Sequence, residues 1–352
     1  VGYWQGPDLV FENYAAGRRV PAGPLLCRIL DFFDSWRPVD ELIAAIDGLP
    51  PDSLRAAVRQ LASLSLLQRS DRPPHPREPL LEGWNGWNPS AGFFHFSTRD
   101  VAYGGSADDL HARLRRRARR SPPPAPSKRY RGSPRIALPA VNGDGPLKDA
   151  LLARRTWRTF GRQPIPLDTL ATLLGLTWKV QRWIQVPGAG RVPLKTSPSG
   201  GARHPIEAYV LALRVRGLPR GLYHYAADVH ALERIAGGSS PRQVGRYLPR
   251  QDWFGSAAAI VFMTAVFARP QWKYEHPRGY RAVLIESGHF CQTFCLVATD
   301  LGLAPFCSMA LADSRIERDL GIDGVTESVL YAAGVGTRPQ GTSWAPWPST
   351  AG

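Results

Sequence analysis

The chain has 352 residues, of which 43% are hydrophobic and 21% are charged, and its formal net charge is +15. This composition is typical of a globular protein that buries a real core, and the length suits two domains, or one large domain with an appendage. No apolar run reaches the roughly 18 residues of a membrane span, and no signal peptide is recognised, so the sequence predicts neither.

The positive charge is concentrated in one segment. Residues 111–135 carry ten basic and no acidic side chains, whereas residues 1–110 have a net charge of −4. A basic patch of this kind can bind RNA or an acidic peptide, but a solvated linker is the simpler interpretation. We therefore expect no nucleic-acid partner.

The four cysteines, Cys27, Cys291, Cys295 and Cys307, form no CxxC motif and no disulfide-framework spacing. This pattern predicts a reducing, cytoplasmic location without structural zinc or disulfides. Cys291 and Cys295 lie with His289 in an apolar stretch at helical spacing. Core packing is the favoured interpretation, and we predict no metal site.

Residues 1–75 have the pattern of a small winged-helix domain. Three helices are predicted at 25–33, 39–46 and 52–64, followed by the first strand of a wing at 65–69. Such a scaffold binds DNA or peptides. The third helix offers only Arg55 and Arg59 in a net acidic region, which disfavours DNA.

Residues 76–144 are predicted to be a connector. Its first part is aromatic, at 84–89 and 93–97, and we expect it to lie across the next domain. The following basic part runs into prolines at 122–124, which predicts the end of a helix and then a stiff, extended stretch.

Residues 145–340 are predicted to form a compact domain of helices and strands, before a tail at 341–352. Helices are expected at 147–155, 167–175 and 280–301, the last stopped by Gly302. Strands are expected at 208–215, in a hairpin at 221–235, at 257–267 in the centre, and at 303–307 and 329–335. The absence of a glycine fingerprint argues against a Rossmann domain.

Three motifs in this domain carry chemistry. Arg154, Arg155 and Arg158 leave a helix and can converge on a phosphate, although a basic surface turn would look the same. The small residues Pro198, Ser199, Gly200 and Gly201 precede a strand and allow close approach to a phosphate or a flat ring, although they can also be a simple turn.

The third motif is the pair Lys273 and Tyr274. Lysine and tyrosine side chains in general titrate at about 10, so a residue of either type acts as a base at neutral pH only if its pKa is lowered. Neighbouring Arg278 and Arg281, or partial burial, would lower it. Taken alone, the pair is an ordinary polar loop.

In order along the chain, these motifs, followed by Glu286-Ser287-Gly288-His289 and Gly334-Val335-Gly336, resemble the nitroreductase superfamily. They resemble most closely its SagB-type azoline dehydrogenases. The resemblance covers about residues 145–340. The front unit is similar, more weakly, to the winged-helix peptide-recognition element attached to enzymes that modify ribosomal peptides.

The resemblance implies an α+β fold with a mostly antiparallel central sheet flanked by helices. It implies a homodimer that binds FMN noncovalently at the subunit interface. Arg154, Arg155 and Arg158 match phosphate and ribityl contacts, and Gly336 and Arg338 fall where the closing strand meets the phosphate. Residues 198–201 match the loop that meets the isoalloxazine, often from the partner subunit.

Lys273 and Tyr274 match the Lys-Tyr pair of the azoline oxidases, which implies oxidation of a thiazoline or oxazoline to the aromatic ring. Either residue can be the base. The implied partners are a peptide substrate, with a leader peptide and a cyclodehydratase, and the substrate is either ribosomal or synthetase-bound. Two alternatives stay open: another flavin oxidation, or nitro or quinone reduction with NAD(P)H, on the same fold; and a catalytically inactive peptide- or nucleic-acid-binding module.

Overall fold

The computed structural model describes residues 1–102, 107–127, 138 and 145–341. The N-terminal unit starts with the antiparallel strands β1 (Gly2–Gln5), β2 (Asp8–Asn13) and β3 (Arg18–Pro21). The helices α1 (Pro24–Phe32), α2 (Val39–Ala45) and α3 (Pro51–Ser63) follow. They enclose a small apolar core, formed by Ile29, Leu42, Ile46, Leu54 and Leu61.

The three predicted helices are present within one or two residues, but the winged-helix assignment is not confirmed. The strand expected at 65–69 is wrong: among the described residues, the backbone there turns back, and the amides of Leu66 and Leu67 bond to the carbonyl of Leu61. Leu66 and Leu67 thereby pack on the helical core. The sheet of this unit precedes its helices instead of following them.

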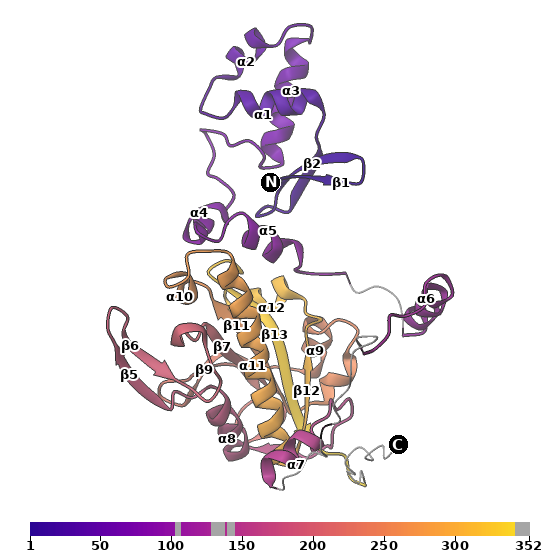
Figure 1. Cartoon of the computed structure of the whole chain (residues 1–352), viewed down its shortest axis with the longest axis vertical. Helices are drawn as coiled ribbons and strands as arrows, with labels where there is room; N and C mark the ends of the chain where they lie inside the picture. Colours follow the sequence, from indigo (N-terminus) through magenta and orange to yellow (C-terminus); the bar gives the residue numbers. More distant parts are fainter. Residues whose placement is uncertain (103–106, 128–137, 139–144, 342–352) are drawn as a thin grey trace.

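The connector is ordered where it meets the next domain. It forms α4 (Glu78–Leu81), the 3-10 helix η1 (Glu82–Trp84) and α5 (Ser90–Ser97), which lie between the N-terminal unit and the large sheet (Figure 1). The basic segment contains α6 (Ala107–Arg120), a helix that stands apart from both. The rest of the predicted basic stretch, from 128 to 135, and all of the predicted tail but residue 341 lie outside the described residues.

The large domain is built on a six-stranded antiparallel sheet in the order β10-β9-β7-β11-β13-β12, as predicted for an α+β fold. The central strand is β11 (Ala259–Val266), between β7 (Ile206–Ala212) and β13 (Glu327–Thr337). On the outside lie β9 (Gly221–Ala226), β10 (Ala231–Gly237) and β12 (Leu303–Ser308).

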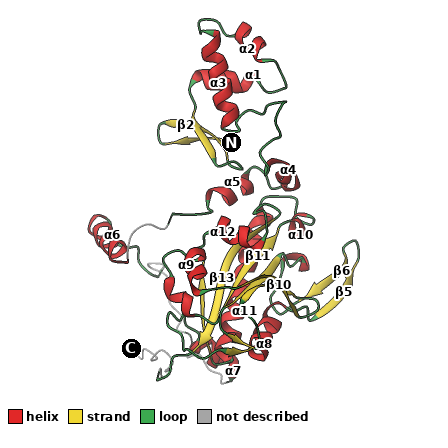
Figure 2. Cartoon of the chain, turned by 180° about the vertical axis from the view of Figure 1, so that it is seen from behind, coloured by secondary structure: helices red, strands yellow, loops and turns green. Residues whose placement is uncertain are grey.

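Helices cover both faces of this sheet, so β11 is apolar on both sides. Its Val261 and Met263 pack with α8 (Leu167–Trp178) and α11 (Arg278–Asp300), whereas Ile260 and Phe262 pack with α9 (Pro241–Tyr247) and α12 (Asp313–Leu320). Figure 2 shows the same sheet from behind, with α7 (Pro146–Ala153) at one end and α10 (Ala268–Gln271) at the other.

Smaller strands complete the domain. A hairpin of β5 (Arg182–Val186) and β6 (Gly190–Leu194) projects from it, and β4 (Ile165–Pro166) pairs with β8 (Val215–Arg216). Two short 3-10 helices, η2 (Gly200–Ala202) and η3 (Asp252–Ser256), precede β7 and β11.

Helix α11 ends at Asp300, two residues before Gly302, whose φ of +73° favours glycine. Among the described helices, α11 alone is long and apolar enough to cross a membrane by length and composition. Half of that window is buried, because the helix packs in the core against the sheet and α8. Its outer face carries the exposed Leu284 and Ile285.

Candidate active site

One group of predicted site residues lies where β12 begins and β13 ends. The segment after α7 is fixed there by two backbone hydrogen bonds, from Trp157 N to Pro305 O at 2.9 Å and from Gly161 N to Thr337 O at 2.8 Å. The guanidinium groups of Arg155 and Arg338 then lie 5.6 Å and 6.0 Å from the centre of the Trp157 ring. The structure therefore brings two predicted motifs together around one tryptophan.

The charges at this end fit a phosphate. Burial and the positive charge of Arg155 lower the pKa of Arg338, so the fold holds two cations close together where an anion would stabilise both. Arg154 is half-buried on the same segment, and Arg158 is exposed. At Gly336 a Cβ would lie 2.8 Å from the Phe160 ring, so only glycine lets the segment pack on β13.

A second group lies at the opposite end of the sheet. The loop 198–201 precedes β7, and its Gly201 has a φ of +61°. A Cβ on Gly201 would overlap the Lys273 side chain, at 2.7 Å from Cδ, and one on Gly200 would lie 3.6 Å from the Tyr274 ring. The second and third predicted motifs are therefore in direct contact.

Lys273 and Tyr274 sit on a tight turn after α10. Both amides donate to Pro270 O, at 3.1 Å and 2.9 Å, and Lys273 Nζ lies 5.6 Å from the centre of the Tyr274 ring. Trp87 of the connector donates from Nε1 to Tyr274 O at 2.7 Å. The pair is thus held from two sides, by its own turn and by a distant tryptophan.

The two groups do not meet within one chain. Along β11, Ala259 pairs with Val335 near the arginines and Val266 pairs with Glu327 near the Lys-Tyr end. Seven steps of about 3.3 Å separate these pairs by roughly 23 Å. Within one chain, a ligand would have to span about this distance to touch both groups.

The family model for "Nitroreductase family" matches residues 151–337, which include both groups except Arg338. The chain belongs to the nitroreductase family. It is therefore an oxidoreductase by family, and its fold is the nitroreductase-like fold that the motifs predicted.

Three relatives of this nitroreductase-family chain are informative. The trifolitoxin-processing protein TfxB of Rhizobium leguminosarum bv. trifolii is 24% identical over 86% of each chain. A protein of Methanocaldococcus jannaschii named as a nitroreductase is 30% identical over 53% of this chain and 89% of its own. The microcin B17-processing protein McbC of Escherichia coli is 32% identical, over 41% of this chain and 53% of its own. The TfxB similarity extends well beyond the nitroreductase domain.

The connector tryptophans lie against the nitroreductase domain, as expected, but their hydrogen-bond partners were not predicted. Trp84 and Trp87 are buried in the core of the nitroreductase domain, and Trp84 Nε1 donates to Val325 O at 3.0 Å. A Cβ on Gly279 would lie 2.7 Å from the Trp87 ring. The Trp-Asn-Gly-Trp spacing at 84–87 was the available signal, but only the fold reveals which backbone the indole nitrogens face.

The cysteines of α11 are buried, as predicted, and they have a third neighbour. The sulfur atoms of Cys291, Cys295 and Cys307 all lie within 4.8 Å of one another, and the Tyr331 hydroxyl donates to Cys307 Sγ at 3.3 Å. Such a group is close enough to hold a metal ion, so the expectation of no metal site stays a prediction. No local spacing indicated that Cys307, on a strand, would join a helical pair.

Proposed function

We propose that this protein is an FMN-dependent azoline dehydrogenase, which oxidises thiazoline or oxazoline rings of a peptide natural-product precursor to the aromatic rings. The observation that carries the proposal is the contact of Lys273 and Tyr274 with the 198–201 loop in a nitroreductase-family domain. Relatives named as processing proteins of trifolitoxin and microcin B17 support a peptide substrate.

The donor set fits FMN. The phosphate of FMN would be held by Arg154, Arg155, Arg158 and Arg338. Gly336 would allow the segment after α7 to pack closely on β13 beside it. The loop 198–201 of the partner subunit would approach its ring system. FMN, when bound, supplies the acceptor for the hydride that leaves the azoline.

The remaining chemistry belongs to the chain. Aromatisation also removes a proton from the neighbouring ring carbon, and Tyr274 or Lys273 would take it. Their turn and the Trp87 hydrogen bond fix the backbone, so the base is positioned before the substrate arrives. General-base help of this kind contributes roughly 10²–10⁴-fold.

The basic test is direct. Purified protein should be yellow and release FMN on heating, and an azoline peptide should lose two hydrogen atoms per ring, as measured by mass spectrometry. Fast NAD(P)H consumption with quinones and no azoline oxidation would instead favour the second candidate, a nitro or quinone reductase. A colourless protein that cannot be loaded with FMN would favour a binding module.

The separation of the two groups supports a homodimer. Leu284 and Ile285 on α11, with Leu147, Leu151 and Leu152 on α7, are exposed, and we propose that they lie in the subunit interface. Two copies related by a two-fold axis would place the arginines of one chain beside the Lys-Tyr pair of the other.

Subunit mixing tests this arrangement. Co-expression of an Arg154→Ala/Arg158→Ala chain with a Lys273→Ala chain should restore about a quarter of wild-type activity, because half of the randomly formed dimers have one intact site of two. Each variant alone is the control. If every mixture is as inactive as its parents, the site is complete within one chain.

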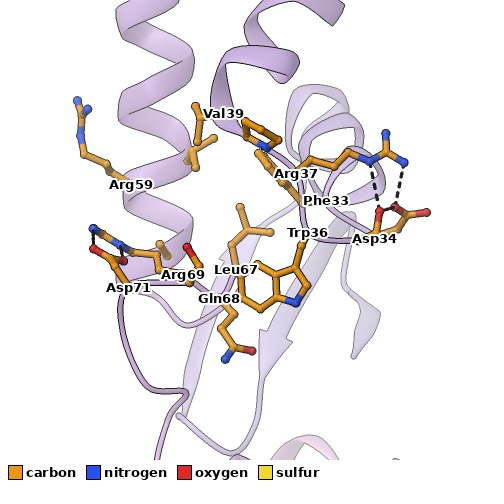
Figure 3. Close-up of a pocket in the computed structure, with 15 residues that line it drawn as sticks. Phe33, Asp34, Trp36, Arg37, Val39, Arg59, Leu67, Gln68, Arg69 and Asp71 are labelled. Atoms are coloured by element: carbon orange, nitrogen blue, oxygen red, sulfur yellow. Dashed lines mark hydrogen bonds and ion pairs between the residues drawn. The ribbon is translucent and has the colours of Figure 1, made fainter.

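The N-terminal unit is the proposed peptide-binding element. A cleft of about 670 Å³ opens between the α1–α2 loop and the end of α3. Figure 3 shows the exposed Trp36 beside Leu67 in it, with Arg37 paired to Asp34 at its rim. An aromatic and apolar floor with charged edges suits a peptide strand.

We expect a chain that starts at residue 76 to keep FMN, because the arginines lie at the far end of the sheet, and to lose leader-peptide affinity.

Trp36→Ala in the full chain should weaken peptide binding at least several-fold, measured by fluorescence anisotropy of a labelled leader. The exposed Trp253→Ala is the matched control. Binding of duplex DNA at physiological salt, without peptide affinity, would contradict the assignment.

A further inference from the structure

Beneath the 198–201 loop, two buried side chains face each other without a partner. Glu286 on α11 and His204 after η2 are each 4% exposed, and Glu286 Oε1 lies 3.8 Å from His204 Nδ1. Neither atom has a hydrogen-bond partner among the described residues. Buried polar atoms without partners are costly, so this pair requires an explanation.

The surroundings of the other His204 ring nitrogen and of the other Glu286 oxygen limit where a proton can lie. The backbone of Pro193 favours a proton on the ring of His204, and since Nδ1 has no partner, we assign that proton to Nε2. The Ser199 hydroxyl and the Gly200 amide interact with the Glu286 carboxyl group and partly offset the effect of burial on its pKa. If both groups were in their usual forms at neutral pH, Nδ1 and Oε1 would present lone pairs to each other.

One proton between the two atoms removes the conflict, and the surroundings place it on the glutamate. Burial raises the pKa of Glu286 to about 7. Burial, and then the charge of Lys195, lowers the pKa of His204 to about 4, with further contributions from Arg269 and Arg203. These cations oppose an imidazolium, and the burial of the carboxyl group opposes a carboxylate.

The loop that Glu286 holds is strained. Gly201, Ala202 and His204 have φ values of +61°, +55° and +43°, and the last two are not glycine. Such backbone persists only when its surroundings fix it. Ser199 Oγ accepts from His204 N at 2.8 Å, and Arg269 Nη1 donates to His204 O at 2.8 Å, while the inner side is held by Glu286.

We propose that Glu286 is a protonated carboxylic acid in the folded protein up to neutral pH, with its proton directed toward His204 Nδ1, and that it acts as a positioning residue that holds loop 199–204 against Lys273 and Tyr274. Its positioning role rests on the proposed function. The protonation state does not, and it can be measured without substrate or FMN.

Infrared spectroscopy measures the protonation state. At about pH 6, below the Glu286 pKa of about 7, wild-type protein should have a buried carboxylic acid carbonyl band that disappears about two units higher. Glu286→Gln should lack it, and Glu275→Gln, at an exposed glutamate of the neighbouring loop, should keep it. If the wild-type and Glu286→Gln spectra agree at pH 6, the proposal is wrong.

A second variant covers the case in which Glu286→Gln does not fold. In His204→Asn, an amide N–H can replace the lone pair that faces Oε1, so Glu286 should ionise and its band should be lost at about pH 6. A band that persists unchanged in His204→Asn would overturn the shared proton.

The pH dependence of stability is an independent test of the Glu286 protonation state. The folded pKa of Glu286 lies above its value of about 4.5 in the unfolded chain, so its contribution is complete below that value and is lost as pH rises to about 7. Gln cannot ionise, so the melting temperature of Glu286→Gln should rise relative to wild type across this window and level off above it. A constant difference would contradict the proposal.

Turnover then tests the positioning role. Glu286→Gln offers an amide N–H to His204 and an oxygen to the loop, so it should keep azoline oxidation within about threefold of wild type at pH 6 and stay active at higher pH. Glu286→Ala should slow azoline oxidation at least tenfold relative to wild type. A folded, FMN-loaded Glu286→Gln that is inactive would mean that the carboxylate itself is required. Absence of azoline oxidation in wild type would refute only the proposed function.

Discussion

Lys273→Ala and Tyr274→Phe should each keep FMN, fold and dimer, and each should slow azoline oxidation by at least about 10²-fold, the lower end of base catalysis. The two side chains lie on one turn, 5.6 Å apart from ammonium to ring centre, so we expect them to act on the same proton. The double variant should then be little worse than either single variant. Anaerobic single-turnover bleaching of the flavin by an azoline peptide isolates this step from reoxidation.

Glu275→Ala is the control for this experiment, because Glu275 is the next residue of the same loop and is exposed. It should bleach at the wild-type rate. A surface loop without a catalytic role would tolerate all three changes within about 0.5 kcal/mol of stability. Wild-type bleaching rates in the Lys273 and Tyr274 variants would remove the mechanism and leave only the nitroreductase fold.

Arg154→Ala combined with Arg158→Ala should abolish stable FMN binding. Charge-assisted contacts contribute about 1.5–3 kcal/mol each, so losing two weakens binding by roughly 10²–10⁴-fold. Fluorescence of flavin that passes an ultrafiltration membrane gives the dissociation constant. Arg113→Ala combined with Arg117→Ala, on the exposed helix α6, removes the same charge elsewhere and should have no effect. Full retention of FMN in the first double variant would exclude these arginines from the site.

The sequence predicted elements best where periodicity was strong. Every position of β11 except Thr264 is apolar, because both sheet faces are covered, and α11 carries a long apolar pattern that ends before Gly302, so both were found. The strands β1 to β3 have four to six residues and few buried positions, which gives no period to detect. The pair Leu66 and Leu67 resembled a strand because two apolar residues cannot distinguish a strand from a turn that packs on a helix.

The site was predictable as a set of motifs but not as a geometry. Lys273 and Gly201 are far apart in sequence, and their contact depends on β7 and β11 running antiparallel, so that the start of one lies beside the end of the other. The same strand directions place Arg338 at the opposite end. Strand order and direction are long-range properties that no local spacing encodes, and the contact between Trp87 and Tyr274 O follows from them.

The attachment of the connector has a consequence for the order in which a substrate is processed. Through Trp84 and Trp87, the chain that leaves the N-terminal unit is anchored at the Lys-Tyr end of the sheet (Figure 1). Consider a precursor whose leader is bound to that unit. Rings closer to the leader than the distance from the cleft to Lys273 could not reach the Lys-Tyr pair. Of the remaining rings, those nearest to the leader would react first. Regioselectivity would then depend mainly on the length of peptide between the leader and each ring, and less on the side chains around that ring.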